Sequence, residues 1–188
     1  MKAQKDDNTM VTLADSMGNG IVAKGTLYAG NFTGKVAING DLHVTGACTD
    51  SGMCFGDLAE NVDVAENVIA GDIVEINDKG IAVKSSRPYS KAMIGVISEK
   101  PSMILAGGES VGGRRAPLAL AGIVLVRVTN ANGAIEIGDY ITSSNISGVG
   151  MKAIESGYVV GKALRSFDKP LGNVLILVDL DSIYLGSK

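Results

Sequence analysis

The sequence has no tryptophan, a single histidine and two cysteines, and aromatic residues make up only 4% of its 188 residues. No apolar run approaches the roughly 20 residues of a membrane-spanning helix, so we expect no membrane insertion. Charged residues account for 20% of the chain, and the net charge is -3. Because lysine and arginine are scattered rather than gathered into a basic patch, we expect no nucleic-acid partner.

The first residues, Met1 to Asn8, lack the apolar core of a signal peptide. We therefore expect either a protein that leaves its cell by lysis, as virion proteins do, or a fragment or mature form of an exported protein.

Glycine, in contrast, is abundant at 25 residues, and 46% of the chain is apolar. This composition excludes a disordered chain and suits β-solenoids, fibres and barrels with tight glycine corners. No window keeps the i, i+3, i+4 apolar spacing of a capped amphipathic helix. The sequence therefore predicts an all-β protein.

The chain divides into three parts. Residues 1–19 are polar and weakly periodic, which predicts a flexible N-terminal arm for attachment to other proteins. Residues 20–56 contain apolar runs of three to five residues separated by glycines, and strands this short need a solenoid or partner chains to bury both faces. We expect a Gly-rich trimeric β fibre or solenoid there, with a β-meander as the alternative, followed by a β-barrel-like head over residues 57–188.

An internal repeat runs through the head. Each copy has Gly-Asp and two apolar residues, then a strand ending in lysine, then an apolar-Gly-apolar unit, which predicts a duplication. Glycine and aspartate suit the turn that leads into a strand, and no acidic cluster with calcium-site spacing accompanies them. The matched segments are Gly71–Val74, Gly80–Lys84 and Ile94–Ile97 in the first copy, and Gly138–Ile141, Gly148–Lys152 and Val160–Ala163 in the second.

Two cysteines and one histidine precede the head. Cys48 and Cys54 bracket a turn-rich loop, where they can form a small disulfide ring or remain free thiols, and a zinc site is the least favoured reading. His43 is expected to be solvated, although in a three-chain fibre three copies facing the axis could hold a transition metal. We expect no resident metal and no cofactor.

Several short motifs of the head resemble a known family. Phe55–Glu60, Gly71–Val74, Ile94–Ser98 and Lys100–Ser102 are similar to the C-terminal intramolecular-chaperone domain, of peptidase G2 type, of phage neck-appendage and tail-fibre proteins and of related bacterial surface proteins. The resemblance covers roughly residues 55 to 180. It implies a domain that assembles a trimeric fibre.

The resemblance also implies a chemical event. Phage members of the family cut themselves at the N-terminal border of the domain, within a Ser-Asp-x-Ala-Glu-like motif. Here the scissile bond would join Gly56 to Asp57, with Asp57 and Glu60 as the acid/base carboxylates. Because Gly56 stands where the motif has serine, an acyl shift is excluded and only water activated by a carboxylate remains. Alternatively, the two carboxylates fix an uncut head to its stalk.

These features predict a structural protein of a phage tail or neck appendage, or of a similar extracellular assembly, located in the virion or at a cell surface. Its head would nucleate a homotrimer, set the strand register and cap the fibre. With His43 as the sole histidine, no Ser-His-Asp site is expected in the head and no multiple-turnover catalysis. Two alternatives remain: a polymer-forming β filament, and a fibre tip that binds a cell-surface glycan through the tyrosines Tyr28, Tyr89, Tyr140, Tyr158 and Tyr184.

Overall fold

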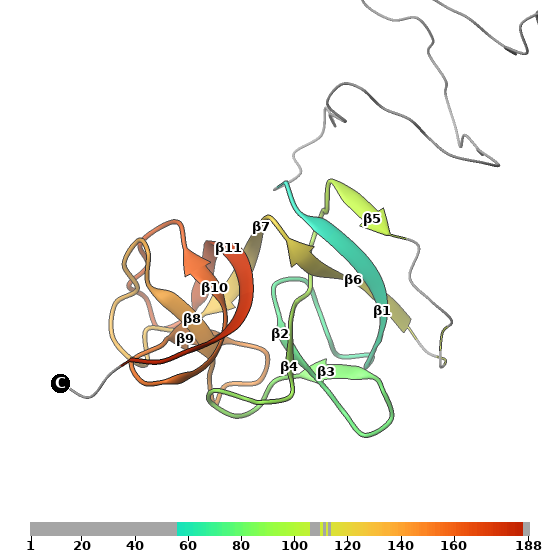
Figure 1. The fold of residues 1–188 in the computed structure, drawn as a ribbon, viewed down its shortest axis with the longest axis horizontal. Helices are drawn as coiled ribbons and strands as arrows, with labels where there is room; N and C mark the ends of the chain where they lie inside the picture. The colour runs from blue at the N-terminus through green and yellow to red at the C-terminus, as the bar shows by residue number, and fades with distance from the viewer. Residues whose placement is uncertain (1–55, 106–109, 111, 113, 186–188) are drawn as a thin grey trace, which may run out of the picture. The chain divides into compact units, whose positions relative to one another are not determined.

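The computed structural model describes residues 56–105, 110, 112 and 114–185, which belong to the compact unit Thr49–Lys188. These residues contain eleven strands and no helix, so the all-β prediction is confirmed for this part of the chain (Figure 1). Within it, no helix exists that could cross a membrane. The predicted arm, nearly all of the predicted stalk, and His43, Cys48 and Cys54 lie outside the described residues.

The strands form two sheets. In chain order they are β1 (Leu58–Val64), β2 (Ile73–Ile76), β3 (Ala82–Lys84), β4 (Met93–Val96), β5 (Met103–Leu105), β6 (Arg114–Ala121), β7 (Ile123–Val128), β8 (Tyr140–Ser143), β9 (Gly150–Lys152), β10 (Gly157–Ala163) and β11 (Gly172–Ile183).

The first sheet contains six strands in the order β4-β2-β3-β1-β5, with β6 paired antiparallel to β1. Strand β1 runs parallel to both β3 and β5. A bridge between Ile97, just after β4, and Leu118 of β6 joins segments that the strand order places apart. The sheet therefore curls into a half-barrel (Figure 1).

The second sheet is a closed barrel in the order β10-β11-β7-β9-β8. Its strand β7 pairs with β11 on one side and β9 on the other. Val124, Val126 and Val128 of β7 are buried, whereas Ile123 and Leu125 on the opposite face are half-buried. The alternating valines thus supply the centre of the core, as their pattern predicts.

A bend at Gly122 connects the two sheets. The apolar run from Pro117 to Val128 predicts one continuous strand, but the structure divides it into β6 and β7. Gly122 has a φ of +104°, a backbone conformation that side-chain-bearing residues rarely adopt. The single-strand prediction is therefore wrong, because this glycine turns the chain out of the half-barrel and into the barrel.

The repeat found in the sequence has matching strand pairing in the two sheets. Strands β1 and β7 hold equivalent places, since each runs parallel to the strand that ends in the repeat's lysine. In each repeat the Gly-Asp strand lies between that lysine strand and the apolar-Gly-apolar strand. The matched pairs are Val74 with Lys84 and with Gly95 in the half-barrel, and Ile141 with Lys152 and with Gly161 in the barrel.

The aspartate of each repeat organises its turn in the same way. Asp72 forms an ion pair with Lys84 at 3.1 Å, and Asp139 forms one with Lys152 at 2.8 Å. In both repeats the backbone N–H three residues upstream donates to the same carboxylate, at 2.8 Å in the first and 2.7 Å in the second. Each carboxylate therefore stabilises the turn that leads into its strand, in agreement with the predicted turn role.

The two sheets share a core. Ile73 of β2 and Val96 of β4 are buried in one cluster with Val126 of β7 and Ile141 of β8. Backbone hydrogen bonds also cross between the sheets, and Ile73 N donates to the carbonyl oxygen of Gly148 at 2.9 Å. The half-barrel and the barrel are therefore packed into one head.

Candidate functional site at the N-terminal junction

Asp57 lies directly before β1, where the chain enters the head, and its side chain is almost completely buried at 1% exposure. Its carbonyl oxygen accepts backbone hydrogen bonds from Ser102 at 2.9 Å and, more weakly, from Met103 at 3.4 Å. These bonds tie the entry segment to the start of β5. The backbone of the entry segment at Asp57 is therefore fixed by contacts within the head.

The carboxyl group of Asp57 has an unusual environment. Both of its oxygens are buried without a hydrogen-bond partner among the described residues. Because burial disfavours the charged form, it raises the pKa of Asp57 above the usual aspartate range. The nearby Ser98 hydroxyl opposes that rise, but it is itself buried without a hydrogen bond of normal geometry. The raised pKa makes the ionised form of this carboxyl a stronger base than an exposed aspartate carboxylate.

The peptide bond between Gly56 and Asp57 packs against the bend at Gly122. A Cβ atom at Gly122 would lie 2.7 Å from the Cα of Asp57 and closer still to the carbonyl oxygen of Gly56. Gly56 is exposed, has a φ of +80°, and would have no atom within 4 Å of an added Cβ. One side of the bond is therefore covered by backbone, while the glycine faces open space.

The conformation of Gly56 gives a physical reason for glycine at this position. A φ of +80° favours glycine and would strain a serine, the residue of the motif that this segment resembles. Position 56 therefore lacks the serine hydroxyl of that motif, and its backbone conformation favours glycine.

Glu60, the second predicted carboxylate, is half-buried in β1. It pairs with Leu118 of β6 and Leu105 of β5. Asp57 precedes β1 and is buried, whereas Glu60 lies within β1 and is only half-buried. The structure places Asp57 beside Ser98 and Gly122, and the joint acid/base role of Asp57 and Glu60 stays a prediction.

Two residues of this junction do not follow from sequence reasoning. Ser98 belongs to a segment that carries the family resemblance, but nothing in its pattern connects it to Asp57, 41 positions earlier. Gly122 lies within an apolar run that predicts a strand, and nothing in that run marks it as a bend. The pairing of β1 with β6 places Gly122 beside the entry segment, and the bridge between Ile97 and Leu118 of β6 brings Ser98 to the same place.

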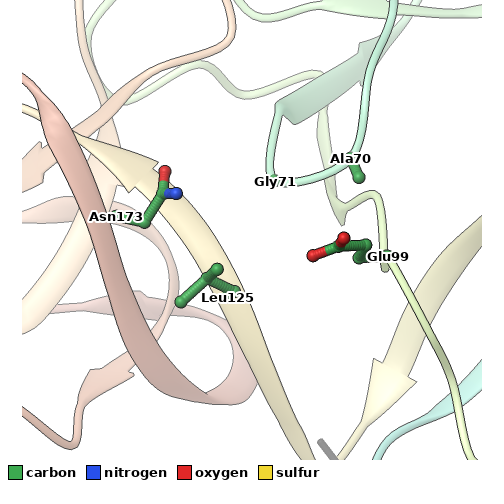
Figure 2. A pocket seen from close by; sticks show the side chains of 5 residues that line it. All are labelled: Ala70, Gly71, Glu99, Leu125 and Asn173. Carbon is green, nitrogen blue, oxygen red and sulfur yellow. The ribbon is translucent and has the colours of Figure 1, made fainter. Parts of the chain in front are cut away.

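A small hollow lies between the half-barrel and the barrel (Figure 2). It measures about 50 Å³ and is lined by Ala70, Gly71, Glu99, Leu125 and Asn173. Figure 2 shows the Glu99 carboxylate and the Asn173 amide on opposite sides of this space. A volume of this size holds a few water molecules rather than an organic ligand, so we regard it as a hydrated seam.

Among residues 56–105, 110, 112 and 114–185, no three His, Cys, Asp or Glu side chains come together as a group that could hold a metal ion.

Comparisons with known proteins bear on the fold. No family model matches the chain, and no curated protein matches its sequence. The solved structure of the pre-mature bacteriophage phi29 gene product 12 aligns with 75% of this chain at a TM-score of 0.52 and 16% identity. The aligned parts of the two proteins share a fold. This chain spans only 24% of the length of that phage protein.

A C-terminal fragment of the same phage protein has also been solved as a crystal structure. It aligns with 65% of this chain and over 100% of its own length, with a TM-score of 0.44 and 17% identity. The similarity to the pre-mature protein agrees with the phage resemblance of the sequence motifs, at the level of the fold.

Proposed function

We propose that this chain is a structural component of a phage appendage, in which a Gly-rich β stalk is followed by a head that holds three chains together and caps them. The observation that carries the proposal is the duplicated all-β head, which has the fold of part of a phage gene product and directly follows a segment paced by glycine. The proposed location is the virion, where the N-terminal arm would attach to other virion proteins.

The surface beside the chain entry supports a partner chain there. Strand β5 lies at the end of the strand order of its sheet, and its residues Met103, Ile104 and Leu105 are 48%, 48% and 42% exposed. Three consecutive half-exposed apolar residues on a strand edge are typical of an interface between chains. Since β5 pairs with the first residues of β1, contact between copies at this strand would bring their stalks together.

Such a head would set the register of the strands in the stalk. Short glycine-spaced strands can slip along one another at little cost. A head that associates first would hold the three stalks at high effective concentration and align them.

The test is the mass of the native full-length chain in solution. We expect three copies, and we expect Ile104→Glu in β5 to shift the protein toward monomer by placing a charge in the interface. Ile137→Glu, at a position 68% exposed and outside β5, is the matched control and should leave the trimer intact. A monomeric wild-type protein would overturn the proposal, and open-ended filaments would favour the polymer-forming alternative.

A second candidate function, self-cleavage between Gly56 and Asp57, is favoured by the buried, unpaired carboxyl of Asp57 beside that bond. In this step Asp57 would accept a proton from water while the oxygen adds to the Gly56 carbonyl carbon. The C–N bond would then break, and the nitrogen of Asp57 would leave as an amine after taking up the proton.

Intact mass spectrometry of the denatured chain distinguishes the two roles. Cleavage gives two pieces, one of which begins at Asp57, and Asp57→Asn should abolish it while the exposed control Glu99→Gln does not. A single uncut mass for the wild type after prolonged incubation would reduce the site to a structural junction. The same experiment on Glu60→Gln tests the other predicted carboxylate.

A further inference from the structure

The connection between β3 and β4 lines an open hollow on the half-barrel. The hollow measures about 360 Å³ and is lined by six consecutive residues, Arg87 to Ala92. The equivalent connection in the barrel, from Lys152 to Gly161, is two residues shorter than the one from Lys84 to Gly95. The shorter connection completes the same strand pairing, so the fold itself does not require the longer loop.

The loop is held in one shape by hydrogen bonds to other strands. The Ser143 hydroxyl donates to the carbonyl oxygen of Arg87 at 2.8 Å and accepts from the Ser90 amide at 3.0 Å. The Ser90 hydroxyl donates to the carboxylate of Glu75, which is buried beneath the loop. The floor of the hollow is therefore preformed, a property that reduces the ordering cost of binding.

Tyr89 is held in a backbone conformation that only glycine usually adopts. Its φ is +52°, and it is the one non-glycine residue with a positive φ within the described ranges. Its hydroxyl accepts backbone hydrogen bonds from Ile154 at 2.9 Å and Glu155 at 3.2 Å, and its ring packs where a side chain at Gly157 would lie. Strained backbone that is fixed by its surroundings is concentrated at binding and catalytic sites.

The charge of the hollow is positive. Arg87 and Lys91 are both exposed, and neither has a carboxylate partner among the described residues. The Glu75 carboxylate is buried and accepts a hydrogen bond from the Ser90 hydroxyl. Two unpaired cations at a preformed hollow favour an anion.

We propose that the hollow of Arg87–Ala92 binds an acidic sugar, in which Arg87 and Lys91 pair with the anionic group and Pro88 and Tyr89 contact the ring. The volume is much larger than a bare ion needs and is in the range of sites for small organic ligands. The anionic group can be a carboxylate, as in a uronic acid, or a phosphate ester. This proposal does not depend on the trimer or on cleavage.

The test is a titration of the uniformly 15N-labelled full-length chain at low ionic strength, followed by the backbone amide signals of residues 87–92. The probes are glucuronate, glucose 6-phosphate and, as the neutral control, glucose. We expect saturable shifts with at least one anion and none with glucose, and the anion that shifts the signals identifies the source chemistry. No shift at these residues with either anion, or equal shifts with glucose, would overturn the proposal.

Paired variants assign the charge contribution. The double variant Arg87→Ala with Lys91→Ala should weaken binding about tenfold or more, because two charge-assisted contacts are lost. The control is Lys100→Ala with Lys169→Ala, two exposed lysines outside the hollow with the same loss of charge. Equal weakening in both double variants would mean that only net charge matters, and the site would be rejected.

Discussion

The Nζ atom of Lys84 lies 3.1 Å from Oδ2 of Asp72, whose side chain is completely buried. The other oxygen of the same carboxylate lies 2.6 Å from Nη1 of Arg127. Lys84 belongs to the half-barrel and Arg127 to the barrel, so one carboxylate links the two sheets. The equivalent Asp139 has only Lys152 as an ion-pair partner among the described residues, and both of these side chains are partly exposed.

This difference predicts unequal effects of the same substitution in the two repeats. Asp72→Asn should lower the free energy of unfolding by about 3 kcal/mol, because two cations lose a buried partner. Asp139→Asn should cost about 1 kcal/mol or less, since its ion pair is exposed to solvent. Urea unfolding of both variants checks the prediction, and equal losses would contradict the linking role of Asp72.

The ion pair of Asp139 and Lys152 predicts that the stability of the fold depends on pH in the alkaline range. The Asp139 carboxylate raises the pKa of Lys152 by hydrogen bonding. A raised lysine pKa stabilises the fold while the lysine is charged, and this contribution disappears as the pH rises through the folded-state pKa. The stability difference between wild type and Asp139→Asn should therefore be constant at neutral pH and shrink above the ordinary lysine range.

Asp57 should make stability fall as the pH rises through the acid range. Its folded-state pKa is raised by burial, so the folded chain binds more protons than the unfolded chain between the ordinary value of about 3.9 and the raised one. The cost of charging the buried group is absent below the ordinary value and fully present above the raised one.

Asp57→Asn should remove this slope. Relative to wild type, the variant should gain stability as the pH increases from about 3.5 toward neutral, measured by urea unfolding across that range. The exposed Asp179→Asn provides the control, whose difference from wild type should not follow the same curve. A stability difference for Asp57→Asn that is independent of pH would show that its carboxyl is not the cause.

Gly122→Ala should destabilise the head more than a change at another glycine with positive φ. Gly133 has a φ of +96° and open space around an added Cβ, so Gly133→Ala measures the conformational cost alone, about 1 kcal/mol. Gly122→Ala adds a clash with the backbone of the Gly56–Asp57 segment and should cost about 3 kcal/mol. Similar unfolding midpoints for the two variants would mean that the Gly56–Asp57 backbone shifts at little energetic cost to accommodate the added methyl group.

Ile73 should be among the most sensitive core positions, because it extends from the half-barrel into the shared core. Ile73→Ala should cost about 3 kcal/mol through lost burial and a cavity. Ile137→Ala, at a position 68% exposed, should change stability by about 0.5 kcal/mol or less. Thermal and urea unfolding of the two variants provide the comparison, and a small loss for Ile73→Ala would show that the sheets do not depend on this contact.

The sequence by itself determined the all-β class, the repeat and the turn role of each Gly-Asp, because these depend on local chemistry. Glycine supplies the backbone conformation and aspartate the hydrogen bonds within a few residues of each turn, as the contacts of Asp72 and Asp139 show. The buried face of β7 is likewise predictable from the sequence, because its valines recur every two residues.

Only the tertiary structure decided which residues meet across long stretches of chain. Arg127 reaches Asp72 from 55 positions away, and Gly122 meets Gly56 and Asp57 because β6 pairs with β1. The burial of the Asp57 carboxyl and the rigid hollow at Tyr89 depend on such pairings. Their energies arise from desolvation and from contacts between strands, and no local pattern in the sequence records either.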